Sequence, residues 1–156
     1  MVRLSVVLAL LALAVPASAS ATFPGPDGRI VFEGDPDHGS ASLFTVSGLG
    51  GSVNPFIAAS TAQTDPAYSA DGRWVAFAEA RDIWIARSDG KGKPIHVTKE
   101  AANDSEPVFS PDGKRVVYLD LNGPEPELFS VAIDGSDRKQ LTSGGGSERT
   151  PTWVRG

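Results

Sequence analysis

Few side chains of this sequence have types and spacings that suit catalysis or metal binding. The 156 residues include two histidines, His38 and His96, and no cysteine, so imidazole and thiolate chemistry have few carriers. His38 lies in the loop 35–39, whose aspartates could surround a cation. Such loops are mostly turns, however, and calcium requires about six or more oxygen ligands. His96 lies in the segment 94–98, which predicts an outer strand with a surface imidazole, so we predict no metal site at either histidine.

The hydroxyl and carboxylate groups also lack a catalytic arrangement. No Gly-x-Ser-x-Gly nucleophile elbow occurs in the sequence. The glycine run 144–147 lacks the Lys-Ser/Thr pair of a phosphate loop and predicts a flexible connection. Asp71 and Asp112 resemble a carboxylate pair, but each precedes glycine in one recurring motif, as Asp27 does. Aspartate at such a turn usually caps the backbone. We therefore predict no catalytic, cofactor-binding or metal-ligating residue, and we assign no binding residue.

The motifs recur along the chain. The sequence Asp-Pro-Ala-Tyr-Ser-Ala-Asp-Gly-Arg at 65–73 is echoed by Glu-Pro-Val-Phe-Ser-Pro-Asp-Gly-Lys at 106–114. A shortened copy lies at 26–29, and another copy begins at 150–153. A period of about 40–45 residues with four short strands is typical of β-propeller blades. The sequence therefore predicts an all-β chain of blade repeats.

The third repeat shows where the strands of one blade are expected. Asp-Gly at 112–113 predicts a tight hairpin turn between strands at 107–110 and 114–120. The second of these strands is apolar in its centre, as suits a strand that is packed on both faces. Two further strands are expected at 127–132 and 138–142, and the last is polar enough to face water.

These motifs, taken in order, resemble a known family. Apolar-Ser-Pro-Asp-Gly-Lys, Val-Val-Tyr, Glu-Leu-Phe-Ser-Val, Asp-Gly and Leu-Thr follow one another within 109–142 and resemble the TolB-like, WD40-like β-propeller repeat. The resemblance covers nearly all of 23–154, although Pro24 replaces the aromatic residue of the later units. It implies a propeller domain over 22–156, with about three four-stranded blades and one terminal strand. The expected units are 23–63, 64–104, 105–147 and a closing strand at 150–154.

The N-terminus has the features of a secretory signal peptide. Arg3 precedes an apolar run at 4–15, and small residues at 17–21 form cleavage signals. The run of roughly 12 residues is shorter than the about 20 that span a bilayer. We expect a signal peptide over 1–19, with cleavage after Ala21 as the alternative, and no integral membrane segment after cleavage. The mature protein is expected to be exported, either to the periplasm or out of the cell.

The charge of the sequence restricts its partners. The formal net charge is −5, whereas nucleic acids and anionic membranes bind basic patches. We therefore expect a protein or peptide partner and no nucleic acid. Because the sequence has no cysteine, an exported chain would also fold without disulfides.

Three blades and one strand do not close a ring. Propellers usually have about four to eight blades, and the family resemblance implies six. One hypothesis is a six-bladed ring of two chains, in which strand 151–154 of each pairs with strand 29–33 of the other. An incomplete propeller that folds poorly and a partly closed monomer are the alternatives. Trp153 would be buried only in a closed ring, whereas Trp74 and Trp84 are expected to pack between blades.

The predicted function is that of a non-catalytic scaffold. The resemblance implies an exported, TolB-like propeller that binds a protein or peptide in the cell envelope. The blades also resemble peptidase accessory domains and propellers with hydrolase or lyase sites in their channels. The predicted inner strands 66–69, 107–110 and 151–154 carry no His, Asp, Glu or Arg for such a site. An orphan propeller fragment without a selected ligand is the remaining alternative.

Overall fold

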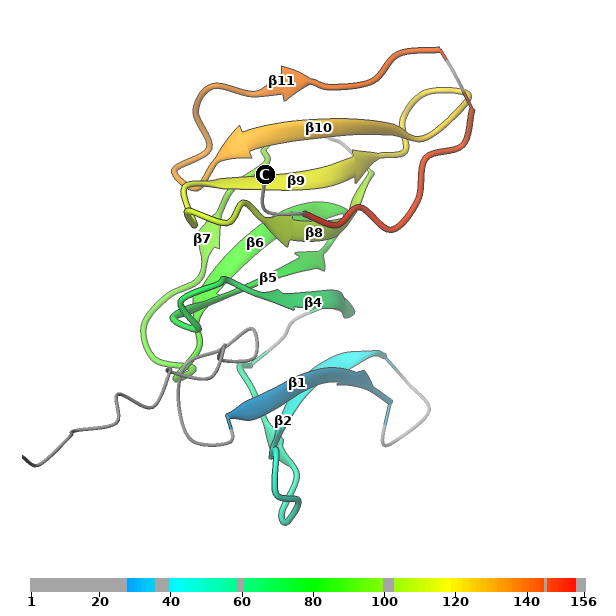
Figure 1. Ribbon diagram of the computed structural model, residues 1–156. Helices are drawn as coiled ribbons and strands as arrows, with labels where there is room; N and C mark the ends of the chain where they lie inside the picture. The colour runs from blue at the N-terminus through cyan, green and yellow to red at the C-terminus, as the bar shows by residue number, and fades with distance from the viewer. Residues whose placement is uncertain (1–27, 36–39, 59–60, 100–102, 145, 154–156) are drawn as a thin grey trace, which may run out of the picture.

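Eleven β-strands form three antiparallel sheets in the computed structural model, and each sheet is one propeller blade (Figure 1). The structure describes residues 28–35, 40–58, 61–99, 103–144 and 146–153. No helix occurs in this part of the chain, so it contains none that could cross a membrane. The blades follow one another as an open array, which confirms the predicted all-β propeller repeat (Figure 1).

Each blade is built from neighbouring strands in chain order. Blade 1 consists of β1 (Arg29–Gly34), β2 (Ser42–Ser47) and β3 (Asn54–Pro55). Blade 2 consists of β4 (Gln63–Tyr68), β5 (Trp74–Glu79), β6 (Asp82–Arg87) and β7 (Ile95–His96). Blade 3 consists of β8 (Asp104–Phe109), β9 (Arg115–Asp120), β10 (Glu127–Ala132) and β11 (Lys139–Gln140). The four-stranded blades are thus present twice, and an inner strand of blade 1 would fall before Gly28, outside the described residues.

The strand pairing aligns the three blades residue by residue. In every blade an aromatic residue of the second strand lies opposite an aromatic residue of the third strand. These pairs are Phe32 with Phe44, Phe77 with Trp84, and Tyr118 with Phe129. The residue directly after the outer strand donates its N–H to the third strand at one common position. These hydrogen bonds run from Phe56 to Leu43, from Val97 to Ile83 and from Leu141 to Leu128, at 2.9, 2.9 and 2.8 Å. Residues matched in this way are called equivalent below.

The hairpin turn before the second strand is held by a serine and an aspartate. Ser69 Oγ donates to Asp71 Oδ1 at 2.6 Å and accepts from the Trp74 N–H at 3.0 Å. Ser110 makes the same two bonds, at 2.6 Å to Asp112 and at 3.0 Å from Arg115. These hydrogen bonds hold the pKa of Asp71 and of Asp112 below the ordinary value. The predicted capping role of both aspartates is confirmed, and Asp27 lies outside the described residues.

The apolar core lies between the blades. One buried cluster joins blades 1 and 2 through Leu43, Val75 and Phe77. A second cluster joins blades 2 and 3 through residues such as Ile85 and Tyr118. Because side chains alternate along a strand, blade 2 packs one face on blade 1 and the other on blade 3. Trp84 packs against the first cluster and Trp74 against the second, as predicted.

The inner strands begin earlier than the sequence suggested. We expected them to start at Pro66 and Pro107, but β4 begins at Gln63 and β8 at Asp104. A register shift interrupts each strand at the residue before proline, where Asp65 has a φ of 54° and Glu106 a φ of 51°. Proline lacks the N–H that continues the ladder, so the strand bulges there and resumes beyond it. The expectation that the inner strands carry no carboxylate was therefore wrong.

The expected closing strand repeats the start of an inner strand but has no strand neighbour. Thr150 precedes Pro151 and has a φ of 44°, as Asp65 and Glu106 have positive φ values before Pro66 and Pro107. Its N–H donates to the carboxylate of Glu106 in blade 3. Thr150 to Trp153 form no ladder in the described chain, so Thr150 repeats the positive φ before proline but not the bulge itself, and Val154 lies outside the described residues. The segment is thus anchored at the position where the inner strand of a further blade would start.

Candidate binding surfaces

Blade 1 has an apolar face that no other blade covers. Val31 packs towards blade 2, so alternation places its neighbours Ile30 and Phe32 on the opposite face. Ile30 is 52% exposed, although the equivalent Val75 and Val116 are both 0% exposed. We call this surface, made of Ile30, Phe32, Phe44 and Val46, the open face of blade 1. It corresponds to the face that blades 2 and 3 each bury against the preceding blade.

Blade 3 has a complementary uncovered face. Leu141 is 53% exposed, whereas its equivalents Phe56 and Val97 are 8% and 2% exposed. Those two residues are buried because the following blade packs on them, and no described residue forms a further blade beyond blade 3. We call the surface around Leu128 and Leu141 the open face of blade 3.

A glycine turn shows how closely one blade packs on the next. A Cβ atom on Gly90 would lie 2.7 Å from the Phe56 carbonyl oxygen, and one on Gly135 would lie 2.7 Å from that of Val97. Gly50 occupies the equivalent turn of blade 1 and has a similar φ of +83°, but no atom of the described residues lies within 4 Å of its Cβ position. Blade 1 therefore carries the docking turn without the neighbour on which the turn docks in blades 2 and 3.

Trp153 lies at the edge of this unfinished array. It follows Pro151 by two residues, as Tyr68 follows Pro66 and Phe109 follows Pro107. Phe109 is 6% exposed, whereas Trp153 is 47% exposed. We expected that only a closed ring would bury Trp153, and in the single chain Trp153 is exposed.

The junction between blades 2 and 3 contains an unusual pair of carboxylates. Asp104 and Asp120 lie opposite each other on β8 and β9. At the equivalent place in blade 2, Gln63 donates its amide to Glu79 at 3.1 Å. Asp104 is 3% exposed, and its carboxyl oxygens have no hydrogen-bond partner of normal geometry among the described residues. Burial raises its pKa to about 7, the Thr98 hydroxyl acts in the opposite direction, and the charge of Asp120 raises it further.

Charged side chains surround this pair. Arg138 donates to Asp120 at 2.6 Å and to the Tyr118 hydroxyl at 2.7 Å. Burial raises the pKa of Tyr118 to about 12, against the effect of its hydrogen bond with Arg138. The Asp104 oxygens are buried, and its raised pKa means that this carboxyl group takes up a proton at a higher pH than an ordinary aspartate does.

The histidine and inner-strand groups form structural contacts. His96 Nε2 lies 2.7 Å from Asp82 Oδ2, and its ring stacks on Trp84 with centroids 4.0 Å apart. It lies on β7 as expected, but it is half-buried rather than fully on the surface. Asp65 accepts from the Glu106 N–H at 3.5 Å. His38 lies outside the described residues, and no three His, Asp or Glu side chains of the described chain are placed to hold a metal ion.

The repeat, the blades and their packing match a known family. The profile of the TolB beta propeller domain matches residues 13–155. The chain belongs to this family. The resemblance to the TolB-like propeller repeat, which the motifs indicated, is therefore confirmed. The motifs around Asp71 and Asp112 lie within the matched TolB propeller domain.

This chain matches parts of several longer proteins. The Tol-Pal system protein TolB of Anaeromyxobacter dehalogenans is 33% identical over 120 residues, which cover 74% of this chain and 27% of that protein. Tricorn protease homolog 1 of Streptomyces coelicolor is 33% identical over 85 residues, covering 54% of this chain and 8% of that protein. The crystal structure of TolB from Acinetobacter baumannii has a TM-score of 0.66 at 26% identity, covering 78% of this chain and 31% of that chain. This chain therefore spans less than a third of each of these relatives.

Proposed function

We propose that this chain is an exported, non-catalytic propeller scaffold that binds a protein or peptide partner in the cell envelope. The proposal includes the predicted signal peptide at 1–19 and a propeller domain over 22–156. One relative is named a Tol-Pal system protein, and that name supports an envelope role. The observation that carries the proposal is the pair of apolar open faces at the two ends of the blade array, because exposed apolar patches mark interaction surfaces.

The inner-strand carboxylates favour a scaffold over an enzyme. Asp65 accepts a hydrogen bond from the Glu106 N–H, and Glu106 accepts one from the Thr150 N–H, each from the residue before the proline of the next repeat. Carboxylates committed to backbone amides position strands rather than transfer protons. A panel of hydrolase and lyase substrates tests this point. Turnover that is lost in an Asp65→Asn variant would contradict the non-catalytic assignment.

The partner is sought by affinity capture. We expect the immobilised, signal-cleaved protein to retain one envelope protein in a stoichiometric amount, and an unrelated propeller on the same support to retain none of it. Equal retention by both supports would refute a selective scaffold.

We further propose that two copies complete one six-bladed ring. The open face of blade 1 would pack on the open face of blade 3 in a second copy, in the way that blade 2 packs on blade 1. A two-fold axis makes two such junctions identical, so no apolar face remains free. Trp153 would then lie beside β1 of the second copy and lose its exposure.

Leu141→Asp is expected to convert a dimer into a monomer. The change places a charge on the open face of blade 3, where its equivalents are buried, and an unpaired charge in an apolar interface is strongly unfavourable. Light scattering after size exclusion measures the mass, and we expect the dimer dissociation constant to rise at least about 100-fold. Ile95→Asp is the matched control, since Ile95 is 39% exposed on the outer edge of blade 2, away from both open faces. A monomeric wild type, or a dimer that survives Leu141→Asp, contradicts the ring.

Gly50→Ala provides an independent test of the same junction. An added Cβ would meet no described atom within one chain, but in the ring it would meet the Leu141 carbonyl as closely as a Cβ on Gly90 would meet that of Phe56. We expect the variant to weaken the dimer by about 10-fold or more. Gly92→Ala has a similar φ of +85° and open space around its Cβ, so it controls for backbone strain. Equal dimer affinities of the two variants would rule out this packing of the glycine turn.

A further inference from the structure

Arg29 of blade 1 is equivalent to Arg115 of blade 3. Arg29 starts β1 and lies opposite Ser47, the last residue of β2. Arg115 starts β9 and lies opposite Ala132, the last residue of β10. The two guanidinium groups therefore begin at the same place in their blades, and their surroundings can be compared atom by atom.

The guanidinium of Arg115 makes three hydrogen bonds within blade 3. It donates to the Asp137 carboxylate at 2.7 Å, to the Asp137 carbonyl at 2.6 Å and to the Ser130 hydroxyl at 3.0 Å. The carboxylate supplies the countercharge, and the hydroxyl and carbonyl satisfy further N–H groups. This arrangement shows which ligands an arginine takes at this position in the blade.

Blade 1 keeps the arginine and the hydroxyl but has lost the carboxylate. Pro55 lies opposite Phe44, as Gln140 lies opposite Phe129. Counting back three residues from each makes Ser52 the equivalent of Asp137. Thr45 is likewise equivalent to Ser130. Arg29 has no hydrogen-bond or ion-pair partner within the described chain.

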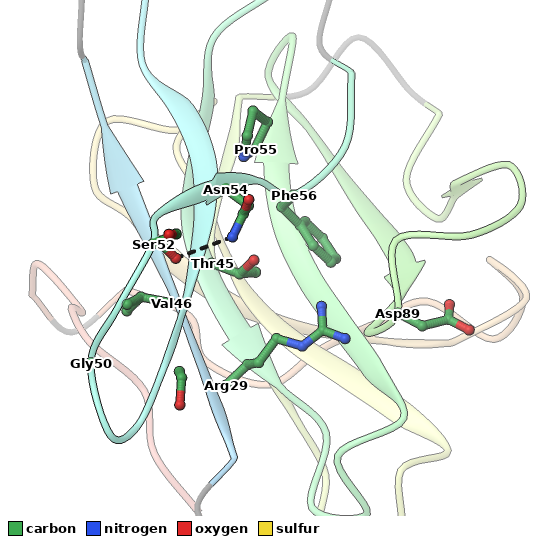
Figure 2. A pocket seen from close by; sticks show the side chains of 10 residues that line it. Arg29, Thr45, Val46, Gly50, Ser52, Asn54, Pro55, Phe56 and Asp89 are labelled. Carbon is green, nitrogen blue, oxygen red and sulfur yellow. Dashed lines mark hydrogen bonds between the residues drawn. The ribbon is translucent and has the colours of Figure 1, made fainter.

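A cavity lies beside Arg29, between blades 1 and 2. The cavity measures about 470 Å³ and is lined by Arg29, Thr45, Ser52, Asn54, Phe56 and Asp89, among others. Figure 2 shows the Arg29 side chain extending into this space. At the next junction the equivalent residue is Trp74, which packs against the apolar core. Arg29 thus occupies in blade 1 the position at which Trp74 fills the junction between blades 2 and 3, and the cavity lies where blade 1 lacks the tryptophan ring.

Asp89 is the acidic residue that lines the cavity, and it is already paired. Its carboxylate accepts from Arg87 at 3.1 and 3.0 Å and from the Lys91 N–H at 3.1 Å. The Arg87 guanidinium and the Lys91 N–H lower its pKa to about 2. Asp89 thus stays charged and bound to Arg87, and Arg29 remains the unneutralised cation of the site.

We propose that this cavity binds a carboxylate group, which Arg29 holds as Arg115 holds Asp137, while the Thr45 hydroxyl accepts from the Arg29 guanidinium as Ser130 accepts from Arg115. The planar guanidinium matches a carboxylate through two parallel hydrogen bonds. The carboxylate comes either from a free small acid or from an acidic side chain of a peptide. The site is formed within one chain, so it goes beyond the proposed scaffold function and does not depend on ring closure.

The test is a titration followed by NMR, with the Arg29 Nε–Hε resonance as the readout. The probes are acetate and the blocked tripeptide Gly-Glu-Gly, with blocked Gly-Gln-Gly as the neutral control at constant ionic strength. We expect both carboxylates to shift the resonance saturably and the glutamine peptide to leave it unchanged. Tighter binding of the peptide assigns the site to a partner's side chain, and tighter binding of acetate assigns it to a small acid. Equal shifts with the glutamine peptide would overturn the proposal.

Two variants distinguish a built site from general charge attraction. Ser52→Asp restores the carboxylate of blade 3 in blade 1, so we expect at least about a 10-fold loss of acetate affinity with the fold intact. Arg29→Gln removes the guanidinium, so acetate binding to this variant is measured from the backbone amide shifts of Ser52 and Asn54. Its matched control is Arg115→Gln, which we expect to leave acetate affinity at this cavity unchanged. Unchanged affinity in Ser52→Asp, or an equal loss in Arg29→Gln and Arg115→Gln, overturns the assignment.

Discussion

Gly135→Ala is expected to lower the free energy of unfolding by about 3 to 4 kcal/mol. The added Cβ would lie 2.7 Å from the Val97 carbonyl oxygen, in a backbone conformation with a φ of +86°. The atom it would meet belongs to the backbone and not to a flexible side chain, so blade 3 must move away from blade 2 to relieve the clash. Domains of this size are stabilised by about 5–15 kcal/mol. The variant therefore removes a large share of the stability of the protein.

Urea denaturation at one fixed protein concentration measures this effect. The control is Gly92→Ala, which has a similar φ of +85° but no atom within 4 Å of its Cβ position. We expect about 1 to 2 kcal/mol for the control, from backbone conformation alone. The difference between the variants reports the blade contact. Equal losses would mean that the turn of Gly135 does not press on the preceding blade.

The sequence predicted the blades because their determinants are local and repeated. Ser110, Asp112 and Gly113 form a turn whose hydrogen bonds lie within six residues, so the motif is enough to predict the hairpin. The second strand around Tyr118 is apolar on both sides: Val116 and Tyr118 pack on blade 2, and Val117 and Leu119 on the other side are also buried. Such features need no knowledge of distant parts of the chain.

The starts of the inner strands were missed for a physical reason. Pro66 and Pro107 looked like first residues of strands, since proline cannot donate to a ladder. The structure instead places a positive-φ bulge before each proline and continues the strand three residues upstream. The recurrence of a polar residue before proline, at Asp65, Glu106 and Thr150, was the signal that could have revealed this bulge.

The equivalence of Arg29 and Arg115 was also invisible in the sequence. β1 begins one residue after Gly28, whereas β5 and β9 begin two residues after Gly72 and Gly113, so glycine-based alignment places Arg29 opposite Arg73 and Lys114. Strand pairing aligns it with Trp74 and Arg115 instead. A one-residue shift moves a side chain to the other face of a strand, and for that reason the cavity required the structure.

The buried Asp104 and Asp120 pair makes the stability of the protein depend on pH in an unusual direction. Asp104 has a pKa of about 7 in the folded protein and an ordinary value of 3.8. Between these values the folded state binds a proton that the unfolded state has released, so this group reduces stability as the pH rises from 4 to 7. At about 1.4 kcal/mol for each unit of pKa difference, the loss amounts to about 4 kcal/mol above pH 7.

Asp104→Asn is expected to remove this loss. The introduced amide would face Asp120 as the Gln63 amide faces Glu79, donating a hydrogen bond without needing a proton from solvent. Urea denaturation at pH 4.5 and pH 8 measures both proteins. We expect the variant to gain several kcal/mol over wild type at pH 8 and to be close to it at pH 4.5. A constant difference at both pH values would show that Asp104 titrates normally.

Asp112→Asn is expected to change the pH dependence of stability in the opposite direction. Its pKa is lowered by Ser110 and the Lys114 N–H, so the stability it provides is present above its unfolded pKa and is lost on acidification. The variant should therefore cost stability at pH 8 and little at pH 3. Asp104 and Asp112 lie eight positions apart, one sealed beside a second carboxylate and one at an exposed hairpin turn. Opposite pH trends in the two variants would show that the blade packing around β8, rather than residue type, determines how each carboxyl group acts on stability.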